Sequence, residues 1–196
     1  MTCWAIIPIK ASFASKSRLA SVLDATERKS LAQTMAKRVC GAVLAARGVD
    51  RICLLGPSRL GLPDELELLP DPGQGLNAAI ASAFEHASNS GASRAIFIHA
   101  DLPMVTSEDV TLLANAAQDE ISIAPDRHRT GTNALSLPLP AARAFDFAFG
   151  VQSFARHSDE IARLRLRARI VDSVGLASDI DEPDDYYALC EGAAKV

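Results

Sequence analysis

The stretch Ala95-Ile96-Phe97-Ile98-His99-Ala100-Asp101-Leu102-Pro103 carries the clearest structural signal in the sequence. An apolar run of strand length ends abruptly in an acid and a proline, which is typical of a buried parallel strand. Ligands of open α/β sheets bind outside the carboxyl ends of the strands, so Asp101 is the first candidate site residue. The alternative role for this carboxylate is to cap the turn or helix that follows.

The composition of the 196-residue chain excludes several classes of protein. It has 20 Lys and Arg against 24 Asp and Glu, with no basic block, which argues against a nucleic-acid partner. The apolar runs are far too short to span a membrane, and the N-terminus lacks a signal-peptide pattern. The four cysteines have no paired spacing, so we expect a cytoplasmic protein with free thiols.

Strand-like and helix-like segments alternate on both sides of Ala95–Pro103. The segments that read as further strands are Trp4–Ile9, Arg51–Leu55, Leu66–Leu69, Ile121–Pro125, Ala134–Leu137 and Arg165–Val171. Helical spacing follows Asp24, Asn77 and Ser107, and also covers Ser153–Leu164 and the C-terminal end. The pattern predicts one three-layer α/β domain over residues 1–196, with a mostly parallel central sheet.

Three cations follow the first predicted strand, in the loop Lys10–Leu19. Lys10, Lys16 and Arg18 would stand at the carboxyl end of that strand, where they can neutralise a polyphosphate. The loop has no glycine-rich phosphate fingerprint, so side chains would do the binding. A solvated loop is the alternative interpretation.

The loop Pro70–Asn77 runs into a predicted helix and contains two glycines. Free backbone N–H groups at such a helix start suit a base edge or a phosphate. We therefore place Asp71, Gly75 and Asn77 among the nucleotide-binding candidates. Asn77 has the helix N-cap as its other possible role.

Two later segments offer groups for a small anionic substrate. Thr132 and Asn133 supply short, directional hydrogen-bonding groups before a strand. Gly150 and Ser153 form a Gly-x-x-Ser turn that enters a helix, which is a ready anion site.

The C-terminal part holds five acids within Asp179–Asp185. A solvated acidic loop is the ordinary interpretation of such a run. The alternative is a metal carboxylate that meets Asp101 from across the sheet.

Four separated motifs together resemble the MobA-like nucleotidyltransferases of Rossmann-type fold. They are Pro8-x-Lys10 with Lys16-Ser17-Arg18-Leu19, Gly75-Leu76-Asn77-Ala78-Ala79, Ala100-Asp101-Leu102-Pro103 and Asp179-Ile180-Asp181-x-Pro183-x-Asp185. Three further motifs resemble the 2-phospho-L-lactate guanylyltransferase family, which makes a precursor of coenzyme F-420. They are Ala124-Pro125-Asp126-Arg127, Gly131-Thr132-Asn133-Ala134-Leu135 and Phe149-Gly150-x-x-Ser153-Phe154-x-x-His157. The likeness runs from Trp4 to about Leu189.

The resemblance implies transfer of GMP from GTP to a small phosphorylated acid, with release of pyrophosphate and dependence on Mg²⁺. The acceptor would be 2-phospho-L-lactate, phosphoenolpyruvate or 3-phosphoglycerate. Asp101 and Asp181 would hold the magnesium, with Asp179 as the fallback for Asp181. Thr132, Gly150 and Ser153 would line the acceptor site. The sequence singles out no surface for oligomerisation, and a homodimer stays a candidate.

The usual Asp-Thr-Pro of the C-terminal motif is Asp181-Glu182-Pro183 here, which leaves the metal ligands open. Two other functions compete with the guanylyltransferase. One is a related nucleotidyltransferase acting on molybdopterin or a sugar phosphate, although such relatives carry a glycine-rich opening loop that this chain lacks. The other is a nucleotide-sensing protein of the same fold without turnover, which the full set of acids and cations argues against.

Overall fold

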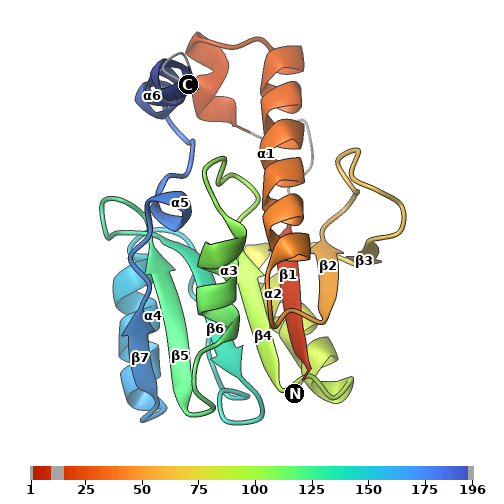
Figure 1. Cartoon of the computed structure of the whole chain (residues 1–196), viewed down its shortest axis with the longest axis vertical. Helices are drawn as coiled ribbons and strands as arrows, with labels where there is room; N and C mark the ends of the chain where they lie inside the picture. Colours follow the sequence, from red (N-terminus) through yellow and green to blue (C-terminus); the bar gives the residue numbers. More distant parts are fainter. Residues whose placement is uncertain (1, 10–15, 194–196) are drawn as a thin grey trace.

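A seven-stranded sheet forms the centre of the computed structural model, which describes residues 2–9 and 16–193 (Figure 1). The strand order is β3-β2-β1-β4-β6-β5-β7. Only β6 runs antiparallel to its neighbours among these strands, so the prediction of a mostly parallel sheet is confirmed. The strands are β1 (Cys3–Pro8), β2 (Arg51–Leu55), β3 (Glu67–Leu69), β4 (Arg94–Ile98), β5 (Glu120–Pro125), β6 (Thr132–Pro138) and β7 (Arg167–Ile170).

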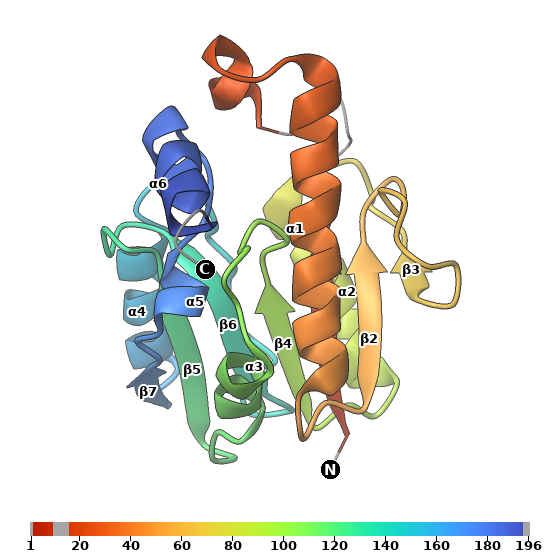
Figure 2. The same cartoon turned by 45° about the horizontal axis from the view of Figure 1, so that its top comes forward.

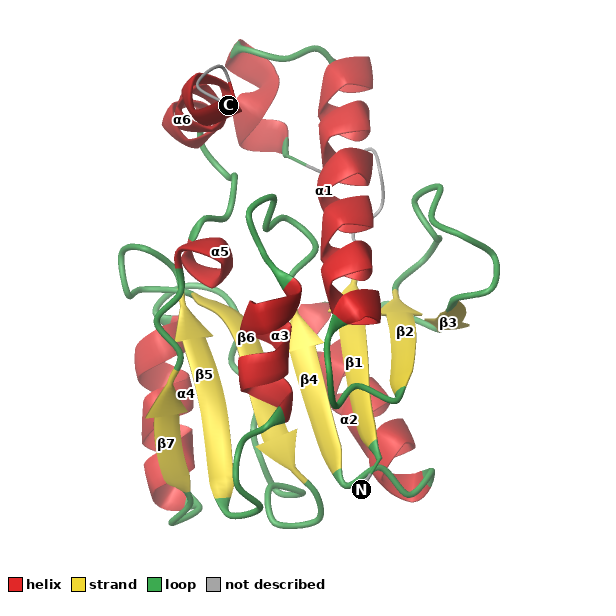
Figure 3. Cartoon of the chain, in the orientation of Figure 1, coloured by secondary structure: helices red, strands yellow, loops and turns green. Residues whose placement is uncertain are grey.

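Helices cover both faces of the sheet and produce the predicted three layers (Figures 2 and 3). One face carries α1 (Ala25–Ala45), α3 (Ser107–Ala114) and the short α5 (Val174–Ala177), and the other carries α2 (Leu76–Asn89) and α4 (Ser153–Arg163). The side chains of β1 alternate between two hydrophobic cores because successive residues of a strand point to opposite faces. Trp4 and Ile6 pack under α2, whereas Ala5 and Ile7 pack under α1.

A small third core lies above the carboxyl ends of the parallel strands. It is formed by Leu19, Leu23, Met35 and Ile180. These residues join α1 to the 3-10 helix η2 (Ser17–Ser21) and to the segment before α6 (Pro183–Ala193), which lie together at the top of Figure 1. This packing brings Lys16 and Arg18 and the acidic segment to the same end of the sheet.

The N-termini of the helices confirm one prediction from the sequence and correct two alternatives. Asp24 caps α1 through a capping box with Glu27, as an acid before an apolar periodic run predicts. Thr106 caps α3, so Asp101 is not the cap of that helix. Gly75 occupies the N-cap position of α2 with φ +90°, which corrects the alternative of Asn77 as N-cap. The short elements η2 and α5 were not predicted. No helix within the described residues is long and apolar enough to cross a membrane.

Candidate active site

The site lies where the strand order of the sheet reverses. Strands β2 and β3 lie on one side of β1, and β4 pairs with β1 on the other side. Loops that leave the carboxyl ends of adjacent strands on either side of such a point diverge and leave a crevice between them. Lys16 follows β1 and Asp101 follows β4, so these two residues meet at the crevice.

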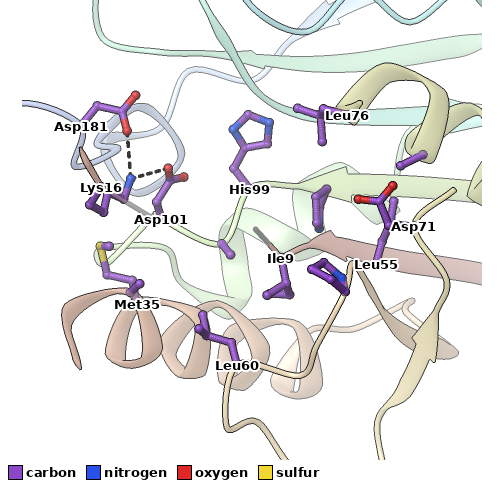
Figure 4. Close-up of a pocket in the computed structure, with 15 residues that line it drawn as sticks. Ile9, Lys16, Met35, Leu55, Leu60, Asp71, Leu76, His99, Asp101 and Asp181 are labelled. Carbon is purple, nitrogen blue, oxygen red and sulfur yellow. Dashed lines mark hydrogen bonds and ion pairs between the residues drawn. The ribbon is translucent and has the colours of Figure 1, made fainter. Parts of the chain in front are cut away.

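Lys16 joins two carboxylates that come from distant parts of the chain (Figure 4). Its Nζ donates to Asp101 Oδ2 at 2.6 Å and to Asp181 Oδ1 at 2.9 Å. Only 8% of the Lys16 side chain is exposed, so these are charge-assisted hydrogen bonds in a largely desolvated setting. The structure thus brings together three predicted site residues that are up to 165 residues apart.

Burial alone would lower the pKa of Lys16, but the charges of Asp101 and Asp181 outweigh it and leave this pKa above its usual value. Lys16 therefore stays an ammonium group at neutral pH. Its backbone has φ +57°, a left-handed conformation that is uncommon for a residue with a side chain. Such a conformation persists at a site only where surrounding contacts hold it.

Arg18 lies at the rim and contacts the acidic segment. Its Nη1 donates to Glu182 Oε1 at 3.0 Å and is 4.0 Å from Asp181 Oδ2. Its side chain is 67% exposed, so Arg18 can reach solvent and a bound phosphate. Glu182, the departure from the usual family motif, thus pairs with Arg18.

Asp185 holds the acidic segment in place, a role that the sequence did not indicate. One oxygen, Oδ2, accepts from the backbone N–H groups of Asp181 (2.9 Å) and Glu182 (2.8 Å), and Oδ1 pairs with Arg127. Burial would raise the pKa of Asp185, but these hydrogen bonds and the Arg127 charge leave it below its usual value. An acid in the first turn of a predicted helix was the available signal for part of this arrangement. Arg127 stands in one of the family-like motifs, but nothing in the sequence indicated that it pairs with Asp185, 58 residues away.

Asn133 holds the third acid of the predicted metal set. Its Nδ2 donates to Asp179 Oδ1 at 3.1 Å and to the carbonyl of Leu176 at 2.9 Å. Burial raises the pKa of Asp179; the hydrogen bond from Asn133 opposes this rise, while the charges of Asp101 and Asp181 add to it. In the structure the Asn133 amide is hydrogen-bonded to Asp179. A contact of Asn133 with the acceptor stays a prediction.

A cavity of about 390 Å³ extends from Lys16 across the crevice (Figure 4). Lys16, Asp101 and Asp181 line one end, while Asp71 and Leu76 line the other, with His99 between them. Asp71 Oδ1 also accepts from the backbone N–H of Gly73 at 2.8 Å, which shapes the predicted nucleotide loop. The space beside Gly73 and Gly75 is open, so a ligand can approach their backbone closely.

Asn77 connects the start of α2 to the turn that holds Gly150. Its Nδ2 donates to the carbonyl of Phe149 at 3.1 Å, and its Oδ1 accepts from the N–H of Phe149 at 2.8 Å. Gly150 follows with φ +119° and open space where a side chain would be. The Asn77 amide is therefore engaged with the backbone of the acceptor turn, and its contact with a nucleotide stays a prediction.

The predicted acceptor residues Thr132, Gly150 and Ser153 do not line the cavity, but chain neighbours of Thr132 and Gly150 contact His99, which does. The backbone N–H of His99 donates to the carbonyl of Asn133 at 3.0 Å, so the start of β6 lies next to a residue that lines the cavity. The ring of Phe149 lies 5.3 Å from that of His99. Thr132 and Ser153 are buried, and the carbonyl of Gly150 accepts from the N–H of Ser153 at 3.1 Å.

Lys10, the remaining predicted cation, lies outside the described residues. Within the residues that are described, no three His, Cys, Asp or Glu side chains are arranged to hold a metal ion. The donor set still fits magnesium chemically, because Asp101, Asp179 and Asp181 are hard oxygen donors and burial beside like charges raises the pKa of Asp179. The Lys16 ammonium now neutralises two of these carboxylates.

Comparison with known proteins agrees with this geometry. A nucleotidyl transferase structure from Methanothermobacter thermautotroptrophicus has a TM-score of 0.67 at 14% identity, with 99% of this chain and 98% of that chain covered. This likeness shows the fold. Fold and site together thus define the class of the protein, a Rossmann-like α/β domain with its charged residues at the switch point of the sheet.

Sequence relatives narrow the class. A phosphoenolpyruvate guanylyltransferase of Sphaerobacter thermophilus is 37% identical over 96% of this chain and 93% of its own length. A 2-phospho-L-lactate guanylyltransferase of Halorubrum lacusprofundi is 37% identical over 89% of this chain and 78% of its own. The family model described as "Guanylyl transferase CofC like" matches residues 3–192. The chain belongs to this family, which confirms the resemblance seen in the sequence.

Proposed function

We propose that the chain transfers GMP from GTP to a small phosphorylated acid and releases pyrophosphate, in the biosynthesis of coenzyme F-420. Membership of the guanylyltransferase family supports the reaction class. The single structural observation that carries it is the bridge of Lys16 between Asp101 and Asp181 at the end of the cavity. A polyphosphate bound at that end meets a buried ammonium and two carboxylates able to share a cation.

The residues of the chain have separate parts in this reaction. Lys16 and Arg18 neutralise the charge that grows on the β- and γ-phosphates as pyrophosphate leaves. Asp71, which lines the cavity, and the open backbone of Gly73 and Gly75 are the groups that we expect to face the nucleoside. Thr132, Gly150 and Ser153 hold the acceptor so that a phosphate oxygen lies in line with the leaving group. This oxygen is already anionic, so the reaction needs no strong general base.

Magnesium is the expected cofactor, with Asp101 and Asp181 as its protein ligands and Asp179 as the fallback for Asp181. When bound, it would supply charge neutralisation and a template for the reacting phosphates. Lys16 shares two of these carboxylates, so we expect its ammonium to turn toward a phosphate oxygen when substrate and metal bind.

The acceptor is a small acid carrying both a phosphate and a carboxylate. The names of relatives include a phosphoenolpyruvate and a 2-phospho-L-lactate enzyme. Because more of the similar relatives are named for phosphoenolpyruvate, this acid is the first acceptor to test.

The test is pyrophosphate release from GTP with Mg²⁺, adding phosphoenolpyruvate, 2-phospho-L-lactate or 3-phosphoglycerate in turn. We expect release with one acceptor and none with GTP alone. GTP binding by calorimetry without release on any acceptor would favour the nucleotide-sensing alternative. CTP in place of GTP is the matched control for the base, and release with CTP alone would contradict the guanylyl assignment.

A further inference from the structure

His157 of α4 is fully buried and uses both ring nitrogens. Its Nδ1 lies 3.0 Å from the Thr132 hydroxyl oxygen, and its Nε2 accepts from the backbone N–H of Ala148 at 3.0 Å. The rings of Phe149 and Phe145 lie 4.7 Å and 5.7 Å from the imidazole. The imidazole is therefore enclosed by aromatic side chains, with one polar contact on each nitrogen.

These contacts determine which nitrogen carries the proton. Because the Ala148 N–H is a donor, Nε2 must be unprotonated, and a neutral imidazole then carries its proton on Nδ1. In a doubly protonated ring the Nε2–H group would face the backbone N–H of Ala148, and the two donors would repel each other. Burial and, to a smaller extent, the charge of His99 lower the pKa of His157 to about 4 against an opposing effect of Glu160, so the ring is neutral at pH 7.

The proton on Nδ1 in turn determines the orientation of the Thr132 hydroxyl. The hydroxyl oxygen accepts from Nδ1–H, and its own proton must then point elsewhere. Among the residues that the structure describes, the Thr132 hydroxyl donates no hydrogen bond to a side chain or to the backbone. Thr132 is the first residue of β6, and the next residue, Asn133, accepts a hydrogen bond from the backbone N–H of His99.

We propose that His157 is a positioning residue that fixes the Thr132 hydroxyl as a hydrogen-bond donor to an anionic oxygen of the phosphorylated acid. This inference rests on the proposed function, because it needs the acceptor to bind at Thr132. It also accounts for a buried histidine that takes no part in proton transfer. The neutral ring transfers no proton to the site; it determines which way the hydroxyl proton of Thr132 points.

Two amide variants separate the two contacts of the ring. The amide nitrogen of His157→Asn can take the place of Nδ1 and keep the donor to Thr132. The amide oxygen of His157→Gln can take the place of Nε2 and keep the acceptor for Ala148. Each variant keeps one hydrogen bond and loses one, so each is a matched control for the other in stability.

The experiment measures pyrophosphate release with GTP and phosphoenolpyruvate, together with thermal unfolding of each variant. We expect His157→Gln to raise the KM for the acceptor by about tenfold, the size of one lost hydrogen bond, and His157→Asn to raise it clearly less. The KM for GTP should change little in both. Adding His157→Gln to Thr132→Val should cause no further loss, because the hydroxyl is already absent.

Equal acceptor KM values in the two amide variants, or full additivity with Thr132→Val, would overturn the proposal. If both amide variants fail to fold, the ring ¹⁵N shifts of wild-type His157 decide: protonation at Nδ1 at pH 7 supports the proposal, and protonation at Nε2 overturns it. Wild-type protein that releases no pyrophosphate with any acceptor is a failure of the proposed function instead. The two failures are thus distinguishable.

Discussion

The carboxylate of Asp185 accepts a hydrogen bond from the backbone N–H of Asp181 at 2.9 Å, from within helix α6. The same oxygen accepts from Glu182, and the other oxygen pairs with Arg127 in the loop after β5. The acidic segment is therefore tied both to its own helix and to the sheet. Its conformation brings the Asp181 carboxylate to Lys16.

Asp185→Asn should weaken both the fold and the activity. The change removes the charge that pairs with Arg127 and exchanges one strong acceptor for a weaker one. We expect a loss of about 1–3 kcal/mol in the free energy of unfolding, measured with urea. Turnover should fall by about tenfold or more, because groups that orient metal ligands typically contribute this much.

Asp184→Asn is the matched control, because Asp184 is the neighbouring acid in the same helical turn and is exposed. It should leave the unfolding free energy within about 0.5 kcal/mol of wild type, as surface substitutions usually do. Similar losses in the two variants would mean that only the net charge of the segment matters.

Glu182→Gln should release Arg18 from its ion pair at the rim. Both side chains are more than half exposed, so we expect less than about 1 kcal/mol of lost stability. The freed guanidinium can then pair with the phosphates of GTP, and the KM for GTP should fall. Steady-state kinetics with varied GTP measures this, and an increased KM would show that Glu182 itself supports nucleotide binding.

Asn77→Ala should loosen the turn at Gly150, because both hydrogen bonds to Phe149 are lost. We expect the KM for the acceptor to rise about tenfold or more. Ser82→Ala, at an exposed position of the same helix, is the control and should change neither KM. A rise confined to the KM for GTP would instead assign Asn77 to the nucleotide.

His157 should make the stability of the protein depend on pH between about 4 and 6.5. The pKa of His157 is lowered to about 4 in the folded state, against 6.5 for an ordinary histidine. Below pH 6.5 the unfolded chain binds a proton that the folded chain does not, so stability is lost as the pH falls. From pH 7 to pH 5 this contribution is about 2 kcal/mol.

Urea unfolding at the two pH values measures this effect. His157→Gln cannot titrate in this range, so it should lack that part of the pH dependence. Parallel losses in the variant and the wild type would show that another group is responsible.

The sequence predicted the parts of the fold that local patterns control. Almost all residues of β1 and β4 are buried, β1 and the part of β4 after Arg94 read as apolar runs, and the capping box at Asp24 marks the start of α1. The direction of β6 was not predictable in this way, because an antiparallel strand in a mixed sheet has the same local pattern as a parallel one. Asn77 was a wrong choice of cap because Gly75, two residues earlier, adopts the positive φ.

The sequence also predicted which charged residues meet at the site, but not how the site is supported. Lys16, Asp101 and Asp181 follow from strand ends and family motifs, whereas the pairing of Arg127 with Asp185 depends on tertiary packing across 58 residues. The separation of Thr132 from Asn133 was predictable in principle, since adjacent residues of a strand face opposite sides. Thr132 contacts His157, and Asn133 contacts Asp179 on the other side.

The most direct test of the central claim is the turnover of Asp101→Asn with GTP, Mg²⁺ and the preferred acceptor. This change keeps the shape of the side chain and removes the charge that meets Lys16. We predict a loss of about 100-fold or more in pyrophosphate release, as for other groups that stabilise charge at a reacting centre, with an unchanged circular dichroism spectrum. Turnover near the wild-type value in a folded variant would contradict the assignment of the reaction to this site.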